Sequence, residues 1–316
     1  MDSIRVSWIV VLLCIGMACV LTRPAHAQVC YTYKTFDIPT PSGQAGQTSF
    51  EGVNHGGVIL GQYANQEPPD GYRVTRKANG SLVVSPYSPI AGHVSWPRGI
   101  NAYRDTVGQV GVVAQPGVFT GYVRKATGGV EILQVPGSVQ AEALGVNRKR
   151  DVVGWFAAAD GIVRGFWRYK GTYLVLEAPG ATWITTLTGI NLAQDITGWY
   201  MDAEGRIHGL HLVDGIPTTL DVPGAENTFV LDLNDAGAMV GLHAPSDAFG
   251  QGFLYQDGAF YPITPGVGEM HSEATGITNG GEIVGNYLAA DGLIRGFVAT
   301  PQPACTTAPA LVALAE

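Results

Sequence analysis

The chain has 316 residues, of which 46% are hydrophobic and 14% are charged, and its formal net charge is −8. This composition supports a sizeable core, and the acidic balance argues against nucleic acid as a partner, because phosphate binding needs a cationic face. The 43 glycines follow neither the period of collagen nor low-complexity clusters, so they indicate turns and close packing.

The first 27 residues show the pattern of a secretory signal peptide. Arg5 precedes an uncharged apolar run over 8–21, and Ala25 and Ala27 form a small-x-small cleavage pattern. An uncleaved membrane anchor is a weaker alternative because spanning takes about 20 apolar residues. A lipoprotein signal is another, although neither cysteine of this stretch follows a leucine at the required spacing. We expect a secreted or periplasmic protein without membrane insertion after cleavage.

Three sequence anchors then recur together in six copies. A Gly-Ile-Asn-like triplet precedes an apolar-apolar-Gly strand, whose glycines stand 43 to 47 residues apart at Gly61, Gly108, Gly154, Gly198, Gly241 and Gly285. A glycine followed by an aromatic residue or leucine opens another strand at Gly71, Gly121, Gly165, Gly209, Gly252 and Gly296. A Pro-Gly ends a strand at Pro136, Pro179, Pro223 and Pro265, and Pro39 and Pro89 stand at the same place in the first two copies. A fixed period of about 40 to 50 residues is typical of propeller blades.

Each copy is predicted to form four short strands, which in the fourth copy are 185–190, 195–200, 207–213 and 217–222. The second strand of the third copy is apolar on both faces, as in a sheet packed between two others. We therefore predict an all-β fold over 28–305, a six-bladed β-propeller of four-stranded antiparallel blades. A parallel β-helix is the alternative, but its repeats are about half as long.

The two ends of the repeat array are predicted to complete one blade. Residues 31–39 match a fourth strand, whereas the last copy stops after its third strand near Thr300. The N-terminal strand should therefore close the ring. Cys30 and Cys305 flank these end strands, and we predict a disulfide between them in place of the missing turn, as an oxidising compartment allows. Two unpaired thiols are the alternative. The tail, 306–316, is expected to be disordered.

Gly189-Ile190-Asn191 and Ile283-Val284-Gly285-Asn286-Tyr287 follow a recurrent extracellular pattern. It resembles the HAF family of probable extracellular repeats, whose units carry Gly-Ile-Asn, Val-Gly-x-Tyr and a strand beginning near His-Ala-Phe. His208-Gly209-Leu210 keeps only the histidine of the last element. The resemblance covers nearly all of 31–300 and implies export and repetition, without bringing an activity or a site residue.

A specific site is expected where the copies differ, since shared positions are scaffold. Three residues before the first anchor stand Ser49, Trp96, Glu142, Thr186, Phe229 and Glu273 in ring order. Copies three apart face each other across the axis, so Glu142 should oppose Glu273 and Trp96 should oppose Phe229. Two carboxylates and two aromatic rings around a shallow mouth could hold a sugar or peptide. Alternatively, the aromatic rings pack between blades and the glutamates are solvated.

His271 lies in a loop of the same face, where fourth strands lead into first strands. It has no partner at a recognised metal-ligand spacing, so we predict neither a metal nor another cofactor.

The chain lacks a Gly-x-Ser-x-Gly elbow, a Gly-Lys-Ser/Thr loop and a Cys-x-x-Cys pair. The leading hypothesis is a secreted, non-enzymatic binding or surface-interaction protein that recognises a glycan or an extracellular protein. A hydrolase or lyase of extracellular polysaccharide, using acidic residues near the axis, is the alternative, since glycoside hydrolysis needs two carboxyls about 5 to 10 Å apart. A structural envelope component is a third hypothesis.

Overall fold

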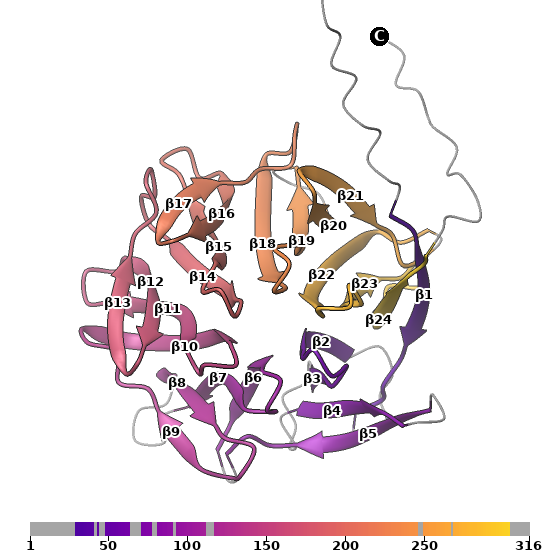
Figure 1. Ribbon diagram of the computed structural model, residues 1–316, viewed down its shortest axis with the longest axis horizontal. Coiled ribbons are helices and arrows are strands. Elements are labelled where there is room, and N and C mark those ends of the chain that lie inside the picture. Colours follow the sequence, from indigo (N-terminus) through magenta and orange to yellow (C-terminus); the bar gives the residue numbers. More distant parts are fainter. Residues whose placement is uncertain are drawn as a thin grey trace, which may run out of the picture.

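Six four-stranded antiparallel sheets form a ring in the computed structural model (Figure 1). The structure describes residues 29–40, 43, 48–63, 71–77, 81–90, 93–111, 117–245, 249–266 and 268–303. Every regular element in this part of the chain is a strand. The predicted all-β, six-bladed β-propeller is confirmed. The predicted signal peptide and the tail after Cys305 lie outside the described residues.

In each blade the chain forms the innermost strand first and then the strands progressively farther from the axis. The first blade contains β2 (Thr48–Val53), β3 (Ile59–Tyr63), β4 (Gly71–Arg76) and β5 (Leu82–Tyr87). The second contains β6 (Ser95–Ile100), β7 (Thr106–Gly111), β8 (Phe119–Arg124) and β9 (Val130–Ile132). The third contains β10 (Ser138–Val146), β11 (Val152–Ala158), β12 (Val163–Tyr169) and β13 (Thr172–Leu176).

The other half of the ring repeats this order. The fourth blade contains β14 (Thr185–Ile190), β15 (Ile196–Met201), β16 (Ile207–Val213) and β17 (Ile216–Thr219). The fifth contains β18 (Asn227–Leu233), β19 (Met239–Ala244), β20 (Gln251–Gln256) and β21 (Ala259–Ile263). The sixth contains β22 (His271–Ile277), β23 (Ile283–Leu288), β24 (Ile294–Pro301) and, outermost, β1 (Tyr31–Phe36).

The N-terminal strand closes the ring, as predicted. β1 pairs with β24 in antiparallel register from Tyr31 opposite Pro301 to Phe36 opposite Gly296. Beyond this ladder, the main-chain N–H of Gln302 donates to the carbonyl oxygen of Cys30 over 2.8 Å. The disulfide between Cys30 and Cys305 stays a prediction, because Cys305 lies outside the described residues. Among the described residues, no helix is long and apolar enough to span a membrane.

The core lies between neighbouring blades. One cluster joins Val107 and Val123 of the second blade to Ala141, Val152 and Phe166 of the third. The sheets are thus buried on both faces, which explains strands that are apolar throughout.

A β-bulge interrupts the two innermost strands of every blade at the same place. The pairing shifts directly before the first residue of the Gly-Ile-Asn-like triplet, for example between Ala143 and Gly145 in the third blade. A bulge leaves one residue unpaired and can re-aim its side chain. The unpaired residues around the ring are Glu51, Arg98, Leu144, Thr188, Leu231 and Thr275, and all of them line the central axis.

Candidate functional site

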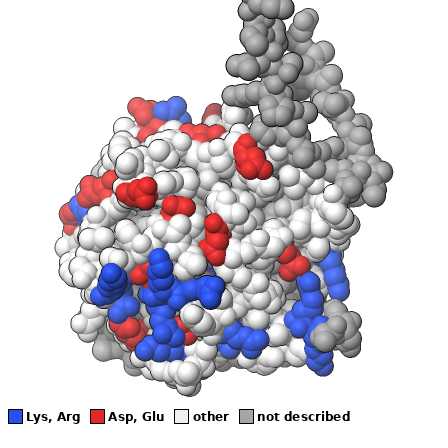
Figure 2. Space-filling view, viewed as in Figure 1, with Lys and Arg blue, Asp and Glu red and all other residues white. Residues whose placement is uncertain are grey.

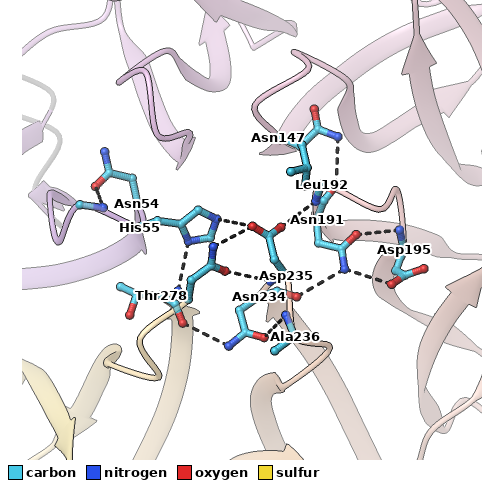
Figure 3. A network of polar contacts seen from close by, with 12 residues as sticks. Asn54, His55, Asn147, Asn191, Leu192, Asp195, Asn234, Asp235, Ala236 and Thr278 are labelled. Carbon is cyan, nitrogen blue, oxygen red and sulfur yellow. Dashed lines mark hydrogen bonds and ion pairs between the residues drawn. The ribbon is translucent and has the colours of Figure 1, made fainter.

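An asparagine ring surrounds the axis at one face of the propeller, and Figure 3 shows part of it. It consists of the third residue of the triplet in five blades: Asn54, Asn101, Asn147, Asn191 and Asn234. Each Nδ2–H donates to the main-chain oxygen of the equivalent residue in the next blade, over 3.0 to 3.4 Å. In the sixth blade Thr278 takes this place, and the main-chain N–H of Asn279 instead donates to Nδ1 of His55 over 3.2 Å.

The same asparagines shape the turns that follow the innermost strands. Oδ1 of Asn54 accepts the main-chain N–H groups of Gly56 and Val58, both over 3.0 Å. One asparagine side chain therefore makes hydrogen bonds both within its own turn and to the neighbouring blade. This double role explains why the triplet recurs, and it assigns the motif to the scaffold.

An aliphatic girdle lies directly beneath the asparagine ring. Its members are the middle residues of the triplets, all buried: Val53, Ile100, Val146, Ile190, Leu233 and Ile277. The girdle lies between a small space of about 50 Å³ beside the asparagine ring and a larger cavity of about 460 Å³. It forms an apolar floor for this larger cavity, which extends toward the face where fourth strands lead into first strands.

The larger cavity, called the central cavity below, combines charged, hydroxyl and aromatic side chains. Its polar and aromatic lining residues are Glu51, Arg98, Glu142, Trp155, Thr186, Thr188, Trp199, Asp232, Glu273 and Thr275. The innermost strands supply most of them, and β11 and β15 supply the two tryptophans.

Arg98 is the centre of a charge network on one side of the cavity. Its Nε donates to Oε1 of Glu142 and its Nη1 to Oε2 of Glu51, both over 2.7 Å. Although burial disfavours the charged guanidinium, these two carboxylates hold the pKa of Arg98 above its ordinary value. The indole N–H of Trp155 donates to the second oxygen of Glu142 over 3.0 Å. The network therefore fixes the positions of both the carboxylate and the indole.

Two further carboxyl groups face the cavity from the fifth and sixth blades. Burial raises the pKa of Glu273, whose Oε1 accepts an N–H of the Asn286 amide over 2.8 Å. Asp232 stands where the other triplets have glycine, and its Oδ2 accepts the main-chain N–H of Ile277 over 3.0 Å. Burial raises the pKa of Asp232 to about 7. Near neutral pH this carboxyl can gain or lose a proton.

The aromatic residues predicted for the site lie behind or away from the cavity. Trp96 is 8% exposed and packs edge-on against Phe119, with ring centroids 4.7 Å apart. Phe229 packs against Trp199 at 5.4 Å. It therefore supports a tryptophan that lines the cavity, without lining the cavity itself.

The structure places only part of the predicted set together. Glu142 and Glu273 both line the central cavity. His271 does not, and it is the first residue of β22 rather than part of a loop as predicted. Its Nδ1 accepts the main-chain N–H of Gly250 over 2.9 Å, and its ring lies beside Phe249. The described residues contain no group of three His, Cys, Asp or Glu side chains suited to a metal ion.

Sequence reasoning missed seven of the ten polar and aromatic cavity residues: Glu51, Arg98, Trp155, Thr188, Trp199, Asp232 and Thr275. A signal for them was present, because each occupies a position at which the six copies differ, either beside a shared glycine or, for Asp232, in its place. Trp155 and Trp199 directly follow the glycine of the second strand, and Asp232 replaces the triplet glycine itself.

Comparison with known proteins identifies the fold. The sequence matches no family model and no curated protein. A fucose-specific lectin from Aleuria aurantia is similar in structure, with a TM-score of 0.50 and 9% identity over 89% of this chain and 97% of the lectin. The likeness is one of fold alone.

Two bacterial structures are also similar. A gluconolactonase from Xanthomonas campestris has a TM-score of 0.47 and 10% identity, covering 86% of this chain and all of that protein. TolB from Acinetobacter baumannii has a TM-score of 0.46 and 13% identity, covering 81% of this chain and 64% of TolB.

Proposed function

We propose that this protein is a secreted carbohydrate-binding protein that holds a neutral sugar in the central cavity. The observation that carries the proposal is the pair Trp155 and Trp199, which line the same cavity as an ordered Arg98 network. Indole faces pack well against the C–H surfaces of sugar rings, while carboxylates and hydroxyls bind sugar hydroxyls. The volume of about 460 Å³ falls within the range of small-molecule sites.

The charges in the cavity favour a neutral sugar over an anionic one. Glu51 and Glu142 already neutralise Arg98. An anionic ligand would find no unpaired cation there, and it would face Glu273 and Asp232. The propeller is also a fold that a fucose-specific lectin uses, so the scaffold is compatible with this ligand class.

A thermal-shift screen of the exported protein against neutral mono- and oligosaccharides tests the proposal. A sugar at about 100 times its Kd should stabilise the protein by about 2.7 kcal/mol. Trp155→Ala/Trp199→Ala should abolish this shift. Trp183→Ala is the matched control, because this tryptophan is 58% exposed and lies outside the cavity. Unchanged sugar binding by the folded double variant would refute the cavity as the site.

Asp232 favours a second candidate function, hydrolysis of a polysaccharide. A carboxyl with a pKa of about 7 can deliver a proton to a leaving oxygen, and other carboxylates share its cavity. Product analysis with each stabilising sugar separates the two candidates. Turnover that Asp232→Asn abolishes while binding persists would favour the enzyme, and stabilisation without products would favour the binding protein.

A further inference from the structure

A basic patch covers two neighbouring blades on the face that carries the asparagine ring. We define it as Arg104, Arg124, Lys125, Arg148, Lys149, Arg150, Arg168 and Lys170. These are eight of the 18 basic residues in a chain whose net charge is −8. All lie in or between β6 and β13, at the turns that join first to second and third to fourth strands. Figure 2 shows Lys and Arg gathered over this part of the ring.

The acidic residues of the same turns point inward. Asp105 is 1% exposed, and its carboxylate accepts hydrogen bonds from Arg150 and from the main-chain N–H of Ala126. Asp151 is 3% exposed and accepts hydrogen bonds from the amides of Asn147 and Gln194. The carboxylates therefore stabilise the turns from below, while the cationic side chains remain at the surface.

Among the described residues, most members of the basic patch form no close ion pair. Within the described part of the chain, Arg150 and Arg168 form ion pairs, with Asp105 and Glu131. The six other members form none there. Unpaired cations concentrated on an otherwise acidic protein produce a local positive potential that attracts anions.

An exposed aromatic ring lies among these cations. Tyr103 is 52% exposed. The guanidinium carbons of Arg148 and Arg150 lie 5.8 and 5.9 Å from the centroid of its ring. Arg148 also lines the small space beside the asparagine ring, so the patch extends inward to the axis. Guanidinium groups can pair with carboxylate or sulfate oxygens through two parallel hydrogen bonds, and a tyrosine ring offers a flat surface to a sugar.

We propose that the basic patch binds an acidic polysaccharide, a glycan chain that carries carboxylate or sulfate groups. The cations would bind the charged groups of such a chain, and the ring of Tyr103 would pack against one of its sugar rings. The patch is confined to two blades of an acidic protein, and this arrangement disfavours extended polyphosphates and anionic membranes. The site is separate from the central cavity, because the aliphatic girdle lies between them.

Binding of polygalacturonate and of dextran sulfate to the full exported protein, measured by calorimetry, tests this proposal. At least one should bind at low salt, while uncharged dextran should not. Affinity should fall as salt rises from about 50 to 300 mM, because these exposed charges are screened. Arg148→Ala/Lys149→Ala should bind about tenfold more weakly, and Tyr103→Ala should also weaken binding.

The matched control is Arg206→Ala/Arg295→Ala, which removes the same charge from the opposite face, in or next to the turns that join second to third strands. It should bind like the unmodified protein. Equal binding by Arg148→Ala/Lys149→Ala, or tighter binding of duplex DNA or anionic vesicles than of both polysaccharides, would overturn the proposal. The patch variants should leave binding of a neutral sugar unchanged, so the two sites can fail independently.

Discussion

The side-chain amide of Asn147 donates to the main-chain oxygen of Asn191 in the next blade, over 3.0 Å. Its own Oδ1 accepts the main-chain N–H of Asp151, also over 3.0 Å. A single buried amide thus holds a turn and joins two blades.

Replacing this amide should be costly. Asn147→Ala leaves a buried carbonyl oxygen and a buried N–H without these partners, so we expect a loss of about 2 to 4 kcal/mol in the free energy of unfolding. Urea denaturation measures it. Asn279→Ala is the matched control, because this exposed asparagine also makes two hydrogen bonds, both with Asp235. It should cost less than about 1 kcal/mol. Equal losses would show that burial is not the cause.

The repeated glycine of the second strand should not tolerate a side chain. A Cβ at Gly154 would overlap the main-chain oxygen of Glu142 in the paired strand. We expect Gly154→Ala to destabilise the protein by at least about 3 kcal/mol or to prevent folding. Gly129→Ala places its Cβ 4.0 Å from the nearest atom, on Lys125, and should change the stability little. Soluble yield and denaturant midpoints give the comparison.

Asp232 should make the stability of the protein depend on pH. Its pKa rises from 3.8 to about 7 on folding. Between these values the folded state holds a proton that the unfolded state has lost, so stability falls as pH rises from about 4 to 7 and then levels off. The contribution is at most about 4 kcal/mol. Asp232→Asn stays neutral, so the stability of this variant should fall less between pH 4 and 7. Parallel profiles of unfolding free energy for the two proteins between pH 4 and 8 would contradict this role of Asp232.

The predicted disulfide should stabilise the folded protein at the sixth blade, where the two ends of the chain pair. The exported chain, purified without reductant and then unfolded, should contain no titratable thiol. Reduction should lower the free energy of unfolding by at most about 5 kcal/mol, because a bond between Cys30 and Cys305 would enclose almost the whole propeller. Cys30→Ser should reproduce the effect of reduction. Two reactive thiols in the oxidised protein would rule the bond out.

The architecture was predictable because its signals are local and repeated. The glycine at Gly154 and its equivalents marks a close approach of strands, and the triplet marks a turn. Even ring closure followed from the sequence, since residues 31–39 matched a fourth strand while the last copy lacked one, and β1 indeed pairs with β24.

The candidate site was less predictable because it depends on how neighbouring strands pair. Simple alternation does not reveal the bulge that leaves Arg98 and Glu51 unpaired and facing the axis. Nor does it show that Trp96 is covered by Phe119, a residue of a different strand. The net negative charge of the chain, −8, likewise concealed a basic patch beneath which Asp105 and Asp151 are buried.

The asparagine ring has a consequence for the order in which the molecule assembles. Its five links each join blades that are consecutive in the chain, so each can form soon after the second blade of a pair is synthesised. The join between His55 and Asn279 and the pairing of β1 with β24 span almost the whole chain. Such distant contacts form slowly. β1 therefore stays unpaired until β24 has formed at the other end of the chain. We expect ring closure to be the rate-limiting step of folding.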